Sequence, residues 1–372
     1  MTSTSGGNDR LRILHVIVML DSGNSQFNEH SLPVMDERDL TLCTYFEPKI
    51  VPPPQIRLFA GDGSLRGFLR VLRQALRVGE YDAVHVHSPH TSFLFVVAML
   101  LRFGRGLRRR SVYTVHDSFY DFKPRNKLLM IPGLAVFSRV VFCSHAAYES
   151  LPAILKRLVG SRARVVQNGV DIARIDRVIA ATEPSYSETF SVLSIGRIEP
   201  VKDPVALVRA FAQSGGDDDT LVFVGEGGLR SELEEAIGEA GLGDRVTLTG
   251  QIEREEVFRR LLGSDVFIST SHGEGLPVAV MESMACSIPV ILSDIPPHRE
   301  FAADPEIIPL VPMGDVAGFA RELARFRSMS DDERAAIGRA CRELVATGFS
   351  LDRMTEGYEA IYRETERVGS KR

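Results

Sequence analysis

The sequence predicts an α/β protein made of two Rossmann-like domains, and three observations support this fold class. The chain has 372 residues, more than one domain usually contains. Short apolar runs alternate with helical patterns in both halves, which is typical of parallel sheets with crossover helices. Residues 176–189 turn polar around Thr182-Glu183-Pro184-Ser185, where we place the interdomain linker.

The strands are expected at short apolar runs that are bounded by turn-forming residues. These runs are residues 12–20, 83–87, 111–116, 139–143 and 163–167 in the first half, and 190–195, 220–224, 245–249, 265–270 and 289–293 in the second. Open parallel sheets bind ligands at the carboxyl ends of their strands. The active site is therefore expected in the cleft between the two domains.

The composition is that of an ordinary globular protein, with 44% hydrophobic and 25% charged residues. The longest apolar run, residues 93–101, is about half a membrane span. The apolar stretch 13–20 lacks a small-residue cleavage site, so it is interpreted as a strand and not as a signal peptide. The four cysteines lie far apart without a Cys-x-x-Cys pair, which indicates reduced thiols in a cytoplasmic protein.

The charge is distributed unevenly along the chain. Lys and Arg outnumber Asp and Glu by nine in residues 1–180 and fall short by fourteen in residues 181–372, which together give the net charge of −5. This asymmetry suggests that the two halves meet different partners.

The most informative stretch is residues 265–293, which reads as one strand–loop–helix–strand unit. Pro277 suits the first turn of the helix, where its missing N–H is not needed. The free N–H groups of residues 275–278 would then form an anion site with the positive helix end behind them.

Two carboxylates flank this expected anion site. Glu274 lies in the loop and Glu282 lies one to two turns into the helix. Ionised carboxylates are strong acceptors for sugar hydroxyl groups. A ligand with a sugar, a diphosphate and a ribose in series would therefore meet Glu274, the helix N-terminus and Glu282 in that order.

This stretch, HGEGLPVAVMESMACSIPVI, resembles the Glu-x7-Glu signature of glycosyltransferase family 4, a family of retaining enzymes with the GT-B fold. The resemblance implies an N-terminal acceptor-binding domain at 1–180 and a nucleotide-sugar-binding domain at 190–348. It also implies a C-terminal helix at 349–372 that crosses back to the first domain.

The resemblance implies four catalytic residues. Arg197 and Lys202, in the sequence GRIEPVKDP, would neutralise the charge that develops on the leaving diphosphate. His116 matches the family histidine that contacts the donor sugar, and Glu274 completes the set. The donor-binding residues would be Gly23, Gly196, Gly225, Ile252, Gly275, Leu276, Pro277, Val278 and Glu282. Gln26, Phe27, Asn28 and His30, which follow the Gly23 loop, would face the acceptor.

No cofactor or metal is predicted, because the nucleotide sugar is itself a substrate. His85 and His87 point to one face of a strand and resemble a metal pair, but no third ligand follows at the usual spacing. No Asp-x-Asp stands at a strand end. Arg197, Lys202 and helix N-termini would therefore hold the diphosphate.

Residues 64–78 form a basic amphipathic helix. Its apolar face would consist of Leu65, Phe68, Leu69, Leu72 and Leu76, and its basic face of Arg66, Arg70, Arg73 and Arg77; a second basic cluster comprises Arg102, Arg105, Arg108, Arg109 and Arg110. These arginines are either a solvated face or a surface for an anionic membrane or acceptor. Nucleic acid is not expected, since no aromatic residues interleave with them.

The function predicted from the sequence is transfer of a hexose-type sugar from a nucleotide diphosphate sugar to a hydroxyl of a glycan, a glycolipid or a small molecule. The acceptor could be lipid-linked, with action at the inner face of the membrane. A nucleotide-sugar epimerase of the same fold and a non-catalytic sugar-nucleotide-binding protein are the alternatives. The residues do not specify the sugar, the base, the acceptor or the oligomeric state.

Overall fold

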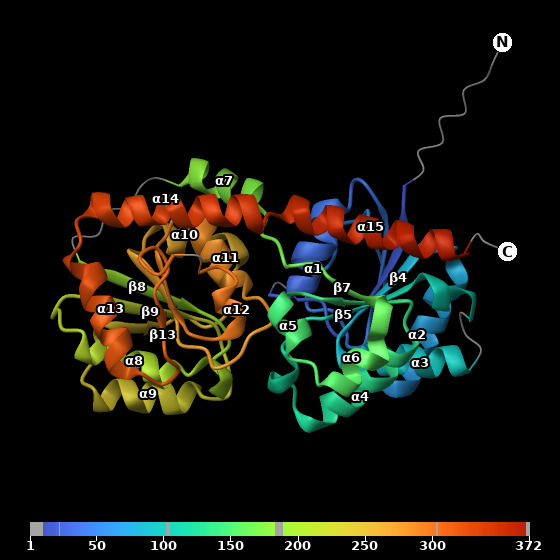
Figure 1. The fold of residues 1–372 in the computed structure, drawn as a ribbon, viewed down its shortest axis with the longest axis horizontal. Helices are drawn as coiled ribbons and strands as arrows, with labels where there is room; N and C mark the ends of the chain where they lie inside the picture. The colour runs from blue at the N-terminus through green and yellow to red at the C-terminus, as the bar shows by residue number, and fades with distance from the viewer. Residues whose placement is uncertain (1–9, 22, 102–104, 183–188, 303, 370–372) are drawn as a thin grey trace, which may run out of the picture.

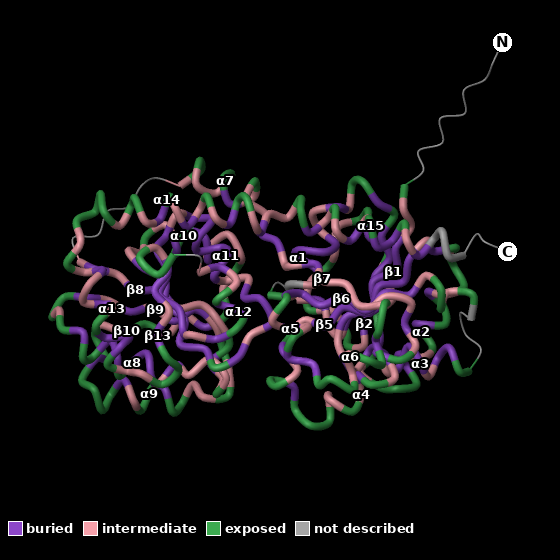
Figure 2. The backbone as a smooth tube through the Cα atoms, in the orientation of Figure 1, coloured by how far each residue is buried: buried purple, intermediate pink, exposed green. Residues whose placement is uncertain are grey.

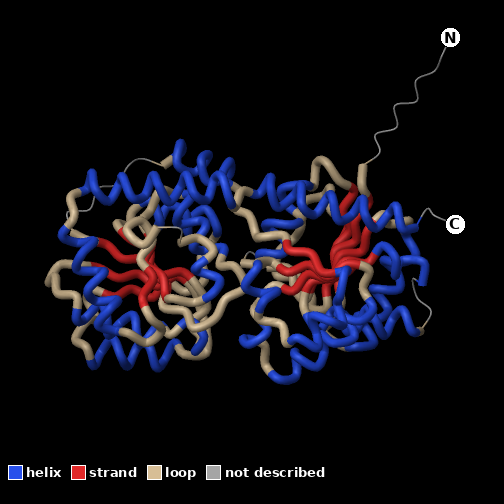
Figure 3. Tube along the Cα trace, in the orientation of Figure 1, coloured by secondary structure: helices blue, strands red, loops and turns tan. Residues whose placement is uncertain are grey.

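A computed structural model describes residues 10–21, 23–101, 105–182, 189–302 and 304–369. The chain forms two parallel sheets, each flanked by helices, which lie side by side (Figures 1 and 3). The central strands are buried in both halves (Figure 2). The predicted fold class, two Rossmann-like domains, is confirmed.

The first sheet has seven strands in the order β3-β2-β1-β4-β5-β6-β7, and the second has six in the order β10-β9-β8-β11-β12-β13. All of the pairings between these strands are parallel. The strands are β1 (Arg12–Ile17), β2 (Asp39–Thr44), β3 (Arg57–Ala60), β4 (Ala83–His87), β5 (Ser111–Val115), β6 (Arg139–Phe142), β7 (Ala163–Val165), β8 (Ser191–Ile195), β9 (Thr220–Val224), β10 (Val246–Leu248), β11 (Val266–Ser269), β12 (Val290–Ser293) and β13 (Leu310–Val311).

The helices cover both faces of each sheet (Figure 1). They are α1 (Ser25–His30), α2 (Leu65–Val78), α3 (Pro89–Leu100), α4 (Pro124–Val136), α5 (His145–Glu149), α6 (Ala153–Val159), α7 (Ile172–Ala181), α8 (Pro204–Gln213), α9 (Arg230–Glu239), α10 (Arg254–Leu262), α11 (Val278–Ala285), α12 (Pro296–Arg299), α13 (Val316–Ser328), α14 (Asp331–Gly348) and α15 (Leu351–Gly369). Short 3-10 turns, among them η2 (Arg105–Arg110) and η3 (Phe119–Asp121), connect some of these elements.

All ten predicted strands are present, but β2, β3 and β13 were not predicted. β2 alternates Leu with Thr and Cys between polar ends, and β3 and β13 have four and two residues and lie at the sheet edges. Strand formation in such short segments depends on the neighbouring strand more than on local propensity. β1 ends at Ile17, three residues earlier than expected.

The linker prediction was wrong for its first residues, because residues 176–181 belong to α7. Asp171 begins this helix, since its carboxylate accepts a hydrogen bond from the Arg174 N–H at 2.8 Å. The central Glu183-Pro184-Ser185 sequence lies outside the described residues.

The apolar face of α2 also differs from the prediction. Its buried residues are Gly67, Phe68, Val71, Leu72 and Ala75. Leu65 is exposed, and Leu69 and Leu76 are half-buried. The four arginines of α2 are exposed as expected, whereas Arg102 of the second basic cluster lies outside the described residues.

The C-terminal helix α15 packs against the first sheet, although α14 lies on the second domain (Figure 1). The backbone pairs at the crossing point, where the Val170 N–H donates to the Phe349 carbonyl at 2.9 Å and the Leu351 N–H to the Val170 carbonyl at 3.0 Å. A Cβ on Gly169 would lie 2.4 Å from the Ser350 carbonyl oxygen, so glycine is needed there. The Asn168–Asp171 turn therefore holds the returning helix.

Candidate functional site

The loop between β11 and α11 is bound to the first domain through three successive carbonyl groups. The Glu274 carbonyl accepts from Ser118 Oγ at 2.7 Å, and the Gly275 carbonyl accepts from Ser144 Oγ at 2.7 Å. The Leu276 carbonyl accepts from Asn168 Nδ2 at 3.0 Å. These donors follow β5, β6 and β7, so adjacent strand ends of one domain contact adjacent residues of the other.

Two glycines allow this close approach. A Cβ on Gly275 would lie 1.8 Å from the His116 carbonyl oxygen, and one on Gly273 would lie 2.0 Å from Asp121 Oδ1. Real side chains do not tolerate such distances, so a larger residue would force the loop and the first domain apart. Ser144 also caps α5, because its Oγ accepts from the Ala147 N–H at 2.9 Å.

Glu274 and Lys202 form an ion pair in the cleft. Ser271 Oγ donates to the same Glu274 oxygen at 2.8 Å. Burial alone would raise the pKa of Glu274, but Lys202, His298 and the Ser271 hydroxyl outweigh burial and lower it. Glu274 is therefore an ionised acceptor, and the Lys202 cation lies beside it.

Arg197 is exposed at the edge of a pocket of about 420 Å³ at the carboxyl ends of β8 and β9. The pocket is lined by Ile195, Gly196, Arg197, Val224, Gly225, Glu226, Gln251, Ile252, Arg254 and Val257 from the second domain, and by Asp21 and Gly23 from the first. A Cβ on Gly23 would lie 3.0 Å from Gln251 Nε2, so the Gly23 loop closes the pocket across the cleft. This volume suits a small organic ligand.

The predicted donor-binding residues fall into three places. Gly23, Gly196, Gly225 and Ile252 line the pocket, and Gly275, Leu276, Pro277 and Val278 form the loop and the helix start. Glu282 is buried and does not line the pocket. Pro277 is the N-cap of α11 and not its first residue, because its ψ of 115° is extended. Their binding roles remain predictions.

The sequence analysis missed the partner of Glu282. Arg254 donates to Glu282 Oε1 at 2.5 Å and to Glu29 Oε1 at 2.7 Å, which joins α11 and α10 of the second domain to α1 of the first. Glu29 Oε2 and Arg254 Nε are buried and have no hydrogen-bond partner in the part of the chain that the structure describes. Arg254 directly follows the segment Gln251-Ile252-Glu253. This position next to pocket-lining residues was the only feature of the sequence that could have indicated Arg254 as a site residue.

The ion triad Glu29–Arg254–Glu282 holds two acids and one base. Burial raises the pKa of Glu29 to about 8. The Arg254 cation opposes this rise, and the Glu282 carboxylate adds to it. Burial also raises the pKa of Glu282, again opposed by Arg254. The triad therefore retains a proton at neutral pH when no ligand is bound.

His116 is half-buried at the end of β5, beside the cleft residue Asp117. Burial lowers the pKa of His116 to about 4, so the imidazole is neutral. The surrounding protein raises the pKa of the Asp117 carboxyl although the residue is exposed, and Glu274 raises it further. Asp117 was not predicted as a site residue, and its position directly after His116 was the available signal.

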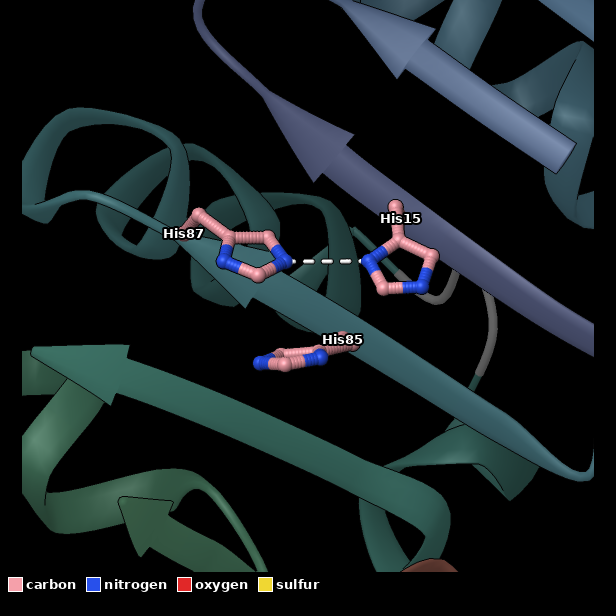
Figure 4. Close-up of side chains that lie close together, drawn as sticks. All are labelled: His15, His85 and His87. Atoms are coloured by element: carbon pink, nitrogen blue, oxygen red, sulfur yellow. Dashed lines mark hydrogen bonds between the residues drawn. The ribbon is translucent and has the colours of Figure 1, made fainter. Parts of the chain in front are cut away.

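A third histidine lies beside His85 and His87, although none follows at the usual spacing along the chain, and the absence of a metal stays a prediction. His15 lies opposite His85 on the neighbouring strand β1, and the three imidazoles are close together (Figure 4). His30, His87 and His116 form a second close group. Sequence spacing did not reveal the third histidine, because it comes from a different strand.

Three of the residues after Gly23 are not free to face an acceptor. Phe27 is 4% exposed and belongs to the core of the first domain. Asn28 is buried, and its Nδ2 donates to the Asn24 carbonyl at 2.9 Å. His30 packs edge-on against His87 and His116.

We predict that Glu29→Gln changes how stability depends on pH. The pKa of Glu29 rises from an ordinary value of 4.5 to about 8 on folding. The stabilising contribution of its proton is complete below pH 4.5 and is lost as pH rises toward 8. The free energy of unfolding of the wild type should therefore fall relative to Glu29→Gln by roughly 1 kcal/mol per pH unit.

Urea unfolding between pH 5 and pH 8 measures this difference. Glu37→Gln, at an exposed position close in the sequence, is the control and should follow the wild type. Parallel curves for the wild type and Glu29→Gln would contradict a protonated Glu29.

Two family models together cover most of the chain. The model for Glycosyltransferase Family 4 matches residues 15–174, and the model for Glycosyl transferases group 1 matches residues 177–344. Each model corresponds to one of the two sheets.

Relatives with known names match over most of their length. The Escherichia coli UDP-Gal:alpha-D-GlcNAc-diphosphoundecaprenol alpha-1,3-galactosyltransferase is 25% identical over 91% of this chain and 89% of the relative. The phosphatidyl-myo-inositol mannosyltransferase of Mycobacterium leprae is 27% identical over 68% of this chain and 66% of the relative.

Solved structures share the fold. Sucrose-phosphate synthase from Thermosynechococcus elongatus superposes with a TM-score of 0.77 at 19% identity, covering 96% of this chain and 100% of that one. Anabaena HepE in complex with UDP and glucose also superposes at 0.77, with 18% identity and coverage of 95% and 99%. With the two sheets, the cleft and the Glu274–Glu282 segment, these matches show that the chain is a glycosyltransferase of the family 4 type with the GT-B fold.

Proposed function

We propose that this enzyme is a retaining glycosyltransferase that moves a hexose-type sugar from a nucleotide diphosphate sugar to an acceptor hydroxyl. The observation that carries this proposal is the position of the Lys202–Glu274 pair and of Arg197. Arg197 lines the pocket on the second domain, and Gly275, which follows Glu274, lies against the His116 carbonyl of the first domain. An epimerase or a non-catalytic binding protein is not favoured, because the relatives are named as transferases.

The nucleotide would occupy the pocket lined by Gly196, Gly225 and Ile252. The diphosphate would then reach the N-terminus of α11, where free N–H groups favour anions. The sugar would lie next to Glu274, whose ionised carboxylate accepts hydrogen bonds from hydroxyl groups. The E. coli relative is named for UDP-Gal, and HepE binds UDP and glucose, which supports a nucleotide sugar as the donor.

The chemistry follows from the charges around the leaving group. The bond between the sugar C1 and the diphosphate oxygen breaks, and a bond from C1 to the acceptor oxygen forms on the same face. A diphosphate oxygen accepts the proton of the acceptor hydroxyl. Arg197 and Lys202 stabilise the negative charge that develops on the diphosphate. We propose that these cations and the start of α11 hold the diphosphate without a metal ion, and that no cofactor is needed.

The acceptor would approach from a membrane surface. Four exposed apolar residues form what we call the α4–α6 patch: Leu128 and Ile131 on α4, and Ile154 and Leu158 on α6. The two helices pack against each other at the edge of the first domain (Figure 1). Five cationic residues lie near the patch in the sequence, namely Lys123, Arg125, Lys127, Lys156 and Arg157, of which Lys156 pairs with Glu149. Exposed apolar side chains with cations nearby in the chain suit the surface of an anionic bilayer.

The position of the α4–α6 patch links it to the cleft. α4 begins three residues after Asp121, which lies against Gly273 of the second domain. An acceptor with a lipid anchor could therefore stay in the membrane while its hydroxyl enters the cleft. Relatives named for diphosphoundecaprenol and phosphatidyl-myo-inositol support such an acceptor. Among the described residues, no helix combines the length and the apolarity needed to cross a bilayer.

We predict selective binding and slow hydrolysis of one nucleotide sugar in a panel that varies the base and the sugar. Calorimetry would measure binding, and release of the nucleoside diphosphate would measure turnover. Glu274→Gln should weaken binding of that donor by about tenfold or more, because a charged hydrogen-bond acceptor is lost. Glu239→Gln, on the exposed face of α9, is the control. If no donor binds, the proposed function is wrong.

Removal of the cations should affect the reaction more than it affects donor binding. We predict that Arg197→Ala and Lys202→Ala lower kcat by about a hundredfold or more, because one such contact contributes roughly 3 kcal/mol to the transition state. KM should change less in Arg197→Ala than in Lys202→Ala, since Lys202 also pairs with Glu274. Arg209→Ala, an exposed arginine on α8, is the control, and an unchanged kcat in both variants would contradict the proposed mechanism.

The membrane proposal predicts flotation with anionic but not with zwitterionic liposomes. Leu128→Ser with Ile154→Ser should release the protein, since both side chains are at least 70% exposed and contribute little to folding. Met313→Ser, an exposed apolar residue of the second domain, is the matched control. Equal flotation of the double variant and the control would assign membrane contact to another surface or to none.

A further inference from the structure

Three histidines form a continuous row of hydrogen bonds that ends at the cleft. His15 Nδ1 and His87 Nε2 are 3.0 Å apart, and His87 Nδ1 and His116 Nε2 are 2.9 Å apart. His15 lies within β1, His87 ends β4 and His116 directly follows β5. Figure 4 shows the ring nitrogens of His15 and His87 facing each other. We call these three residues the histidine row.

The protons in this row are not independent of one another. A neutral imidazole has one N–H and one bare nitrogen, so each contact in the row contains one donor and one acceptor. Burial lowers the pKa of His15 to about 3, with a contribution from Arg38, and that of His116 to about 4. Burial also lowers the pKa of His87 well below its usual value. The row is neutral, and only two proton arrangements satisfy both contacts.

The far end of the row distinguishes the two arrangements. Among the described residues, none forms a hydrogen bond with the buried atom His15 Nε2. In one arrangement this atom is an orphaned N–H, and in the other it is a bare acceptor. Buried orphaned N–H groups are rarer than under-satisfied acceptors. The favoured arrangement therefore has His15 Nδ1–H donating to His87 and His87 Nδ1–H donating to His116 Nε2.

We propose that His15 and His87 are positioning residues that hold His116 with its proton on Nδ1. In this tautomer His116 presents a hydrogen-bond donor to a ligand in the cleft and does not act as a general base. This inference rests on the proposed function, since the expected partner of Nδ1–H is an oxygen of the donor sugar. His15 and His87, on two neighbouring strands, thus determine whether His116 presents a hydrogen-bond donor or an acceptor to its substrate.

The same imidazoles could instead be metal ligands, but the hydrogen-bond geometry favours the row. Both nitrogens of His85 are engaged, with Tyr362 Oη at 2.8 Å and Thr114 Oγ1 at 2.7 Å. The rings of His15 and His87 are inclined by only 16°, as expected for an in-line contact. His30 meets His87 and His116 edge-on. Metal content is therefore an outcome that the experiment must include.

The test measures the His116 tautomer by two-bond 1H–15N NMR correlations on 15N-histidine-labelled protein, with the His116 signals assigned by their loss in His116→Gln. The wild type should show Nδ1–H at His116. His15→Leu removes the first donor and should produce a mixture of tautomers with a kcat that is roughly tenfold lower and a KM within about twofold. His15→Asn keeps an amide donor near the position of Nδ1 and should restore the Nδ1–H signature. His90→Asn, outside the row, should match the wild type.

Three results would overturn the proposal: an Nε2–H tautomer at His116 in the wild type, the same His116 spectrum in His15→Leu as in the wild type, or a stoichiometric transition metal in the purified protein. Elemental analysis of the wild type and His87→Gln would detect that metal. The tautomer is read without substrate. A failed donor panel with an Nδ1–H signature would refute the proposed function alone, whereas donor turnover with an Nε2–H signature would refute only the histidine row.

Discussion

The site depends on the hydrogen bonds between three successive carbonyls of the second domain and three strand ends of the first. Ser118, Ser144 and Asn168 hold the carbonyls of residues 274–276. A loop whose carbonyls are all bound on one side is fixed in orientation, so the N–H groups at the start of α11 and the Glu274 side chain are also fixed. The absence of a side chain at Gly275 makes this contact possible.

The cleft contains ionised groups, whereas the buried ion triad Glu29–Arg254–Glu282 holds a shared proton. Glu274 is ionised because Lys202 and Ser271 compensate for its burial. The ion triad joins the two domains, but its two carboxylates exceed the charge of Arg254. Breaking a buried ion pair on one side is costly, so the triad helps to hold the two domains together.

Histidine has two different roles in this protein. His116 faces the cleft, whereas His15 and His87 lie in the core and make no contact with solvent. A buried neutral imidazole has two ring nitrogens that need hydrogen-bond partners. In a row of imidazoles, most of these nitrogens bond to one another. The α4–α6 patch is a comparable case at the surface. Its apolar residues are exposed to solvent and are not part of the hydrophobic core. Both features cost stability and are best explained by function.

The sequence by itself determined the fold class, the ten main strands and the strand–loop–helix form of the Glu274–Glu282 segment. These depend on local patterns: apolar runs, a Gly-rich loop before a proline, and two carboxylates at a fixed spacing. Arg197 and Lys202 were predicted as site residues for the same reason, since both lie in one loop after a strand, and their roles stay predictions. The short strands β2, β3 and β13 were missed, because pairing and not propensity forms them.

Only the tertiary structure decided which residues meet across the chain. Arg254 and Glu29 are 225 residues apart, and His15 and His87 are 72 residues apart, so no spacing rule connects them. The same holds for the inward direction of Phe27 and for the α7 helix in the expected linker, where Val178 and Ile179 pack against the core. Local periodicity specifies elements, but the register of parallel strands and the docking of two domains specify which side chains form a site.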